Sequence, residues 1–119
     1  MLVDTSVWVD HLRRSDPILV RLLGQGEVVC HPFIIGELAL GSLRRRSEIL
    51  QLLQSLPHLR LASHDEVLSF VDLHQLTGHG IGWVDAHLLA STAMDQAKLW
   101  TRDRRLAKIA EALGLYGHL

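Results

Sequence analysis

Short apolar runs alternate along the chain with longer segments of helical character, and this alternation limits the folds open to it. We predict strands at residues 2–3, 27–30, 59–62 and 98–101, with a last short one at 115–116. Strands separated by helices usually lie parallel in one sheet, because a parallel connection has to cross over that sheet. The sequence therefore predicts an α/β fold in which helices cover both faces of a mostly parallel sheet.

Capping residues and helix breakers place the helices between these strands. Asp4-Thr5-Ser6 favours a helix start after the first strand, and Asp16-Pro17 starts a second helix that stops at residues 24–26. Further helices are expected over residues 32–43, 65–76, 84–94 and 104–113, while residues 44–56 either continue the 32–43 helix or restart it.

Length and charge narrow the class of protein. The 119 residues fit one domain, residues 1–119, since no linker, repeat or low-complexity tract divides them. With 12 basic and 13 acidic residues, the net charge of −1 excludes a general attraction to nucleic acid, so such a contact needs a local basic patch. Cys30 is the single cysteine, which excludes an intrachain disulfide and fits a reducing compartment.

Neither a signal peptide nor a membrane span is expected. Asp4 follows the first three residues directly, unlike the apolar core of a signal peptide. The charge-poor segment 73–94 is too polar and too often broken by glycine to cross a bilayer. We therefore expect a cytoplasmic protein without membrane contact.

Three acids stand alone in segments that otherwise carry no charge. Asp4 is the only charged side chain in residues 1–9, Glu37 the only one in residues 28–43, and Asp85 the only one in residues 73–94. Segments so poor in charge are expected to be core elements, where an ionised carboxylate is costly unless it is paired, hydrogen-bonded or bound to metal.

Each acid also has a purely structural interpretation. Asp4 and Asp103 are in position to cap the helices that follow them, and Asp85 lies near a helix start. Glu37 lies too far into its helix to cap it, so its alternative is a buried ion pair with an arginine.

A shared site is favoured by the position of two acids at strand ends. Asp4 and Asp103 follow predicted strands, and ligands of open parallel sheets bind beyond the carboxyl ends of the strands. Carboxylates that converge there would raise one another's pKa unless a hard cation neutralised them. Oxygen ligands suit Mg²⁺ or Mn²⁺, so the pattern indicates metal-assisted phosphoryl chemistry.

Several short motifs occur in a familiar order across nearly the whole chain. They are Leu2-Val3-Asp4-Thr5-Ser6, then Glu37-Leu38-Ala39-Leu40-Gly41, then Asp85-Ala86 with Leu89-Ala90 and Ala93, and finally Thr101-Arg102-Asp103. In this order and spacing the chain resembles the PIN-domain ribonucleases, and especially the VapC-type toxins of bacterial toxin–antitoxin pairs. Leu106 stands where an aromatic residue often follows the last acid by three positions, a difference that concerns packing.

The resemblance implies a three-layer α/β/α sandwich and an endoribonuclease that depends on Mg²⁺ or Mn²⁺. It also implies a homodimer that a cognate VapB-type antitoxin inhibits. The positions that match the family's catalytic and metal-binding acids are Asp4, Glu37, Asp85 and Asp103, and Ser6 and Thr101 match its pocket hydroxyls.

Basic and aromatic residues near these acids suggest how RNA is held. Arg102, Arg104 and Arg105 flank Asp103, and Arg44 begins a triple arginine that is either a phosphate contact or solvated surface. Trp8 and Trp83 lie close in sequence to Asp4 and Asp85, where core packing is the main expectation and base stacking the alternative.

Two other functions also fit parts of the pattern. A phosphoryl-accepting or phosphatase-like domain would use Asp4, although Ser6 stands where such a phosphatase has its second acid. A non-catalytic PIN-like interaction module would keep the fold, although the presence of all the acids argues against it.

The high apolar content leads us to expect a protein partner. At 48% hydrophobic residues, a chain this short should leave apolar side chains of its first helices exposed. The candidates are Trp8, Leu12, Ile18, Leu19 and Leu22, unless they pack on the sheet.

Overall fold

A small parallel sheet lies at the centre of the computed structural model, which describes residues 1–118. Strand β1 (Leu2–Val3) pairs in parallel with β2 (Leu99–Trp100), with Leu2 opposite Leu99 and Val3 opposite Trp100. Single parallel bridges widen this pair, from Leu2 to Val29, from Cys30 to His58, and from Leu99 to Tyr116. The predicted α/β class with a parallel sheet is confirmed.

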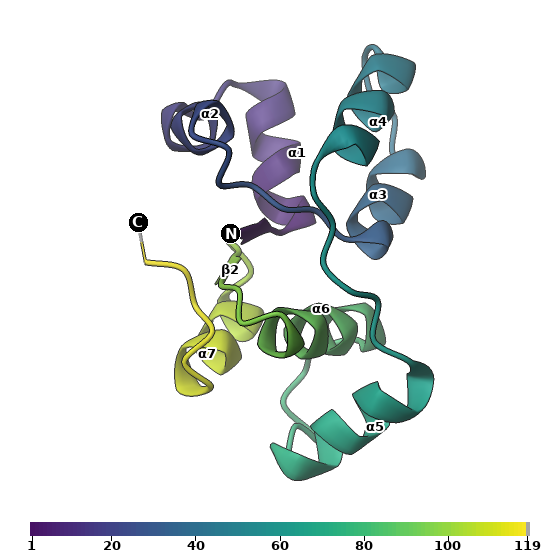
Figure 1. The fold of residues 1–119 in the computed structure, drawn as a ribbon, viewed down its shortest axis with the longest axis vertical. Coiled ribbons are helices and arrows are strands. Elements are labelled where there is room, and N and C mark those ends of the chain that lie inside the picture. Colours follow the sequence, from purple (N-terminus) through teal and green to yellow (C-terminus); the bar gives the residue numbers. More distant parts are fainter. Residues whose placement is uncertain (119) are drawn as a thin grey trace.

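Helices make up most of the described residues. They are α1 (Thr5–Arg13), α2 (Pro17–Gly24), α3 (Pro32–Ala39), α4 (Arg46–Ser55), α5 (His64–Leu73), α6 (Trp83–Met94) and α7 (Arg104–Ala112). Figure 1 shows α1 to α4 in one half of the molecule and α5 to α7 in the other, with the strands between the two halves. Within the halves, α1 packs on α3, α3 on α4, and α5 on α6.

The predicted strand at residues 59–62 is wrong. Pairing stops at Leu59, whose amide donates to the Cys30 carbonyl at 2.9 Å beside the bridge from Cys30 to His58. Two of the amides that follow bond instead to side chains of α6 and of the residue after it. The Arg60 amide donates to Asp95 Oδ2 at 2.7 Å, and the Ala62 amide donates to Ser91 Oγ at 3.4 Å. These bonds replace a strand ladder, because each amide has one hydrogen to donate.

The helix expected over residues 32–43 ends early, at Ala39, and a separate helix restarts at Arg46. Arg45 adopts a left-handed backbone conformation (φ 53°), which a continuous helix cannot contain. The Arg46 guanidinium turns back and donates to the Ala39 carbonyl at 3.0 and 3.1 Å, which satisfies the end of α3.

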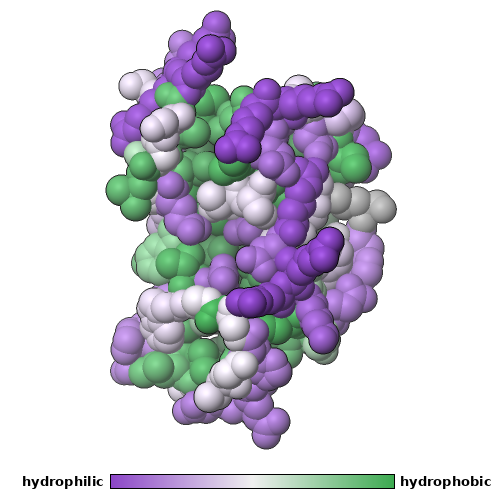
Figure 2. Space-filling model, turned by 180° about the vertical axis from the view of Figure 1, so that it is seen from behind, coloured by the Kyte–Doolittle hydropathy of each residue, from purple (hydrophilic) through white to green (hydrophobic). Residues whose placement is uncertain are grey.

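Both strands and the inner helix faces form the core. Trp8, Leu19 and Leu22 are buried in it, so their expected exposure is wrong and the alternative, that they pack in the core, is confirmed. Leu12 is half-buried. Ile18 is 37% exposed. On the face in Figure 2, hydrophobic side chains are interspersed with hydrophilic ones. Among the described helices, none is long and apolar enough to cross a membrane.

Candidate active site

Asp4 lies at the carboxyl end of β1 and is almost fully buried. Its Oδ2 accepts hydrogen bonds from the hydroxyls of Thr101 (2.7 Å) and Ser6 (2.8 Å), while its amide continues the ladder to the Trp100 carbonyl. The side chain makes no capping bond to α1, so the capping interpretation of Asp4 is wrong. Asp4 is buried because two hydroxyls replace part of the water that its carboxylate would otherwise bind.

The two hydroxyls form one network with the chain that leaves β2. Ser6 Oγ lies 3.3 Å from Thr101 Oγ1 and accepts from the Arg102 amide at 3.0 Å. Thr101 Oγ1 accepts from the Asp103 amide at 3.1 Å. These bonds fix the end of β2 against the start of α1, and they place Asp103 beside Asp4.

Glu37 projects from α3 toward the same region. Its Oε1 accepts from the Thr5 hydroxyl at 3.0 Å, and no arginine pairs with it among residues 1–118. Loss of hydration around the carboxylate raises the pKa of Glu37, and the charges of Asp4 and Asp85 raise it further. The interpretation of Glu37 as a buried ion pair is therefore wrong.

Asp85 occupies the first turn of α6, where its Oδ2 accepts from the Gly82 amide at 3.2 Å. Burial raises the pKa of Asp85, and the nearby charges of Asp4 and Asp103 add to this increase. Asp85 thus combines a role at a helix start with the electrostatic signature of a shared cluster.

Asp103 caps α7, as one of the two interpretations of this residue predicted. Its Oδ1 accepts from the amides of Arg105 (2.9 Å) and Leu106 (3.1 Å). The carboxylate is nevertheless close enough to Asp85 to raise the pKa of that residue. Capping and membership of the acid cluster are therefore compatible.

The donor chemistry of the four acids fits a hydrated hard cation. Each carboxylate uses one oxygen for the bonds above, and within residues 1–118 the other oxygen accepts none. In the same range no three acidic, histidine or cysteine side chains converge closely enough to hold one ion by themselves. Mg²⁺ usually needs only one or two carboxylates and completes its shell with water, so the carboxylate oxygens left without a hydrogen bond fit such an ion.

The arginines predicted to grip phosphate lie in different surroundings. Arg102 donates to Asp10 at 2.9 Å and to Asp16, and its guanidinium lies 5.4 Å from the centre of the Trp100 ring. Arg104 and Arg105 are exposed beside Asp103. Arg44 is exposed in the turn between α3 and α4, where it lines a surface pocket with Arg13 of α1. Arg102 is thus neutralised by two acids, which leaves Arg104 and Arg105 as the cations beside the cluster.

A buried histidine that the sequence analysis did not single out connects two of the helices that carry acids. His31 Nδ1 accepts from the Phe33 amide at 3.0 Å at the start of α3, and its Nε2 lies 3.2 Å from Ser91 Oγ in α6. Burial lowers the pKa of His31 to about 4, helped by His87 and His58. The ring is therefore neutral at neutral pH, with its proton on Nε2, and it joins the helices of Glu37 and Asp85. The only signal in the sequence is a histidine directly before the proline that begins α3.

The acids come from two strand ends and two helices of an α/β domain. The PIN domain family matches residues 1–112, and the chain belongs to that family. The resemblance drawn from the short motifs is thereby confirmed.

Sequence identity to two known proteins indicates which kind of PIN-domain protein the chain resembles. The chain is 53% identical over 107 residues to "Ribonuclease VapC32" of Mycobacterium tuberculosis strain CDC 1551 / Oshkosh, an alignment that covers 89% of this chain and 86% of the relative. The protein of the same name from strain ATCC 25618 / H37Rv gives the same values. The chain is thus similar to VapC-type members of the PIN family.

Proposed function

We propose that the chain is an endoribonuclease that depends on Mg²⁺ or Mn²⁺ and acts as the toxin of a toxin–antitoxin pair. One observation carries the proposal. Four acids come from separate elements: Asp4, Glu37, Asp85 and Asp103. The charges of Asp4 and Asp85 raise the pKa of Glu37, and the charges of Asp4 and Asp103 raise the pKa of Asp85. No cationic side chain pairs with these four among the described residues, so the cluster is suited to hold a divalent ion.

The acids of the site have different roles in the proposed hydrolysis. A bound Mg²⁺ or Mn²⁺ supplies a water of lowered pKa and neutralises charge on the phosphate. Asp4 is held in one orientation by Ser6 and Thr101, which makes it the fixed anchor of the site. Glu37 and Asp85, which come from α3 and α6, would help to hold the ion, and one of them would orient the attacking water.

The alternative functions receive less support. Asp4 is only 6% exposed and its Oδ2 already accepts two hydrogen bonds, which leaves little access for a phosphoryl donor. A non-catalytic module would have no need to keep costly carboxylates together in this way.

The relatives' name supports the proposed partners. A VapC-type protein implies an RNA substrate and a VapB-type antitoxin, and we extend this to a homodimer that works in the cytoplasm. We also propose that residues 1–119 form a single PIN-like nuclease domain.

Cleavage of a labelled RNA by the purified protein tests the proposal. We expect cleavage with Mg²⁺ or Mn²⁺, none with EDTA, and a loss of about 10²-fold or more in Asp4→Asn, Glu37→Gln and Asp85→Asn. Glu48→Gln, at an exposed acid in the first turn of α4, is the matched control and should cleave like the wild type. Full cleavage in EDTA, or by Asp4→Asn, would overturn the proposal.

A further inference from the structure

A row of aromatic rings runs from α3 across the start of α6 to the start of α5. The Phe33 ring centre lies 4.6 Å from that of His87, His87 lies 5.0 Å from Trp83, and Trp83 lies 5.1 Å from His64. We call these four residues the aromatic row. The first two contacts are edge-to-face, the geometry that aromatic pairs favour, so each ring is fixed by its neighbour.

The aromatic row begins at the acid cluster. Phe33 precedes Glu37 by four residues in α3, so the two side chains lie on the same face of that helix. At the other helix, Trp83 is the first residue of α6 and Asp85 lies two positions further on. Residues two positions apart on a helix do not share a face, so the side chains of Trp83 and Asp85 leave the first turn of α6 on different sides. An RNA bound at the acids therefore reaches Trp83 by passing around that first turn.

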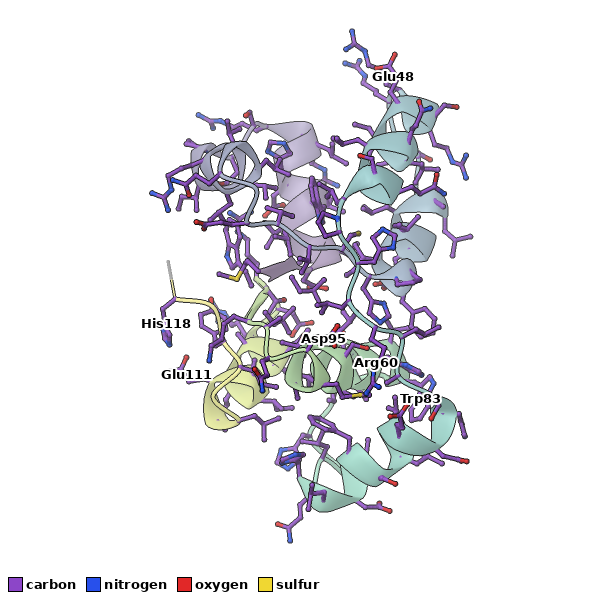
Figure 3. The ribbon with its side chains drawn as sticks, in the orientation of Figure 1. Glu48, Arg60, Trp83, Asp95, Glu111 and His118 are labelled. Atoms are coloured by element: carbon purple, nitrogen blue, oxygen red, sulfur yellow. The ribbon has the colours of Figure 1, made fainter. Side chains whose placement is uncertain are left out.

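Trp83 differs from the other tryptophans in its exposure. It is 41% exposed, whereas Trp8 and Trp100 are 1% and 5% exposed. Figure 3 shows Trp83 beside the first turn of α5. His87 beneath it is buried and its Nδ1 has no hydrogen-bond partner among residues 1–118, so packing alone holds this ring. The indole is thus supported from below and open to solvent.

The surroundings of Trp83 favour a nucleobase over an apolar protein side chain. Its ring neighbours are histidines, and the residue before it is an exposed glycine. Asp65 and Glu66 follow His64 and would repel a phosphate placed there, so a nucleotide would offer its base to this surface. A cation is available in the segment before α6, where the exposed Arg105 donates to the Gly80 carbonyl at 3.5 Å.

We infer that Trp83, assisted by His64, stacks on an unpaired base of the RNA substrate beyond the nucleotide bound at the acids. The inference rests on the proposed ribonuclease function and assigns a substrate-binding residue to it. Aromatic side chains bind single strands in this way because every base has a flat face to stack on.

Binding of a fluorescent single-stranded RNA to the full chain tests the inference, with Asp4→Asn as background to prevent cleavage. Adding Trp83→Ala should weaken binding about 5- to 100-fold, and Trp83→Phe should retain most of it. Leu73→Ala, at a side chain 76% exposed at the end of α5, is the control and should bind normally. A series of RNAs, each with the base removed at a different position, locates the stacked base. At one position in the series, removal of the base should weaken binding to the Asp4→Asn protein and leave binding to the Asp4→Asn, Trp83→Ala protein unchanged.

The outcomes separate the inference from the function on which it rests. If the wild type cleaves RNA while Trp83→Ala and Trp83→Phe bind it unchanged, the stacking inference alone is wrong. If Trp83→Ala abolishes self-association and leaves RNA binding intact, the surface is a protein contact and the inference is again wrong. If the wild type neither binds nor cleaves RNA, both fail.

Discussion

Replacing His31 with asparagine should change how the stability of the protein depends on pH. His31 is fully buried and its pKa is lowered to about 4 from 6.5, so the folded protein does not take up the proton that the unfolded chain binds. The stability that the neutral ring contributes is complete above about pH 6.5 and is lost as the pH falls toward 4. Between about pH 8 and pH 5 this difference in proton binding amounts to about 2 kcal/mol.

His31→Asn retains an acceptor for the Phe33 amide and cannot titrate. At neutral pH it should be less stable than the wild type by about 1 kcal/mol, because the contact with Ser91 is lost. As the pH falls, the wild type should lose this advantage and become the less stable protein near pH 5. Urea unfolding at several pH values measures the two free energies of unfolding, and groups common to both proteins cancel in the difference. His74→Asn, at an exposed histidine, controls for the removal of one imidazole. A difference that stays constant from about pH 8 to pH 5 would refute the reasoning.

Three further predictions concern the acids. Asp4→Asn should lower the pKa values of Glu37 and Asp85, since one source of their increase is removed; NMR titration of the carboxyl carbons measures this, and unchanged values would contradict the shared cluster. Glu37→Gln should raise the melting temperature at neutral pH without metal, because the raised pKa shows that folding disfavours the ionised form, and this gain should vanish as the pH falls through the folded pKa. Asp103→Ala should cost about 1 kcal/mol through the lost cap of α7 while Asp103→Asn keeps it, so equal thermal stability of the two variants would argue against the cap.

Features with local causes were predictable from the sequence. The start of α2 follows from Asp16 and Pro17, and the structure shows Asp16 accepting from the amides of Ile18 and Leu19. Asp4, Glu37 and Asp85 were recognisable as candidates because a lone carboxylate in an apolar segment needs a reason to be there. The rule that parallel strands end at the same edge applied only to Asp4 and Asp103, and it could not place Glu37 or Asp85, which lie on helices.

Features decided by distant side chains were not predictable. Residues 59–62 have the composition of a strand, but Ser91 and Asp95 take up two of their amides. Arg102 is next to Asp103 in sequence, yet its guanidinium turns to Asp10 and Asp16. His31 depends in the same way on Ser91, 60 residues later in the chain. Contacts between residues far apart in the chain cannot be inferred from a local sequence pattern.

The bond from Thr101 to Asp4 joins residues 97 positions apart, and the pairing of β1 with β2 spans the same distance. A ribosome adds residues at about 5–20 per second, so the first strand would wait roughly 5 to 20 s for its partner. During that time Asp4 has no Thr101 hydroxyl to hold it and no Asp103 beside it. A growing chain therefore has no finished pocket, and the messenger RNA and ribosome that make the protein meet only an inactive form of it until residues 101–103 have been added.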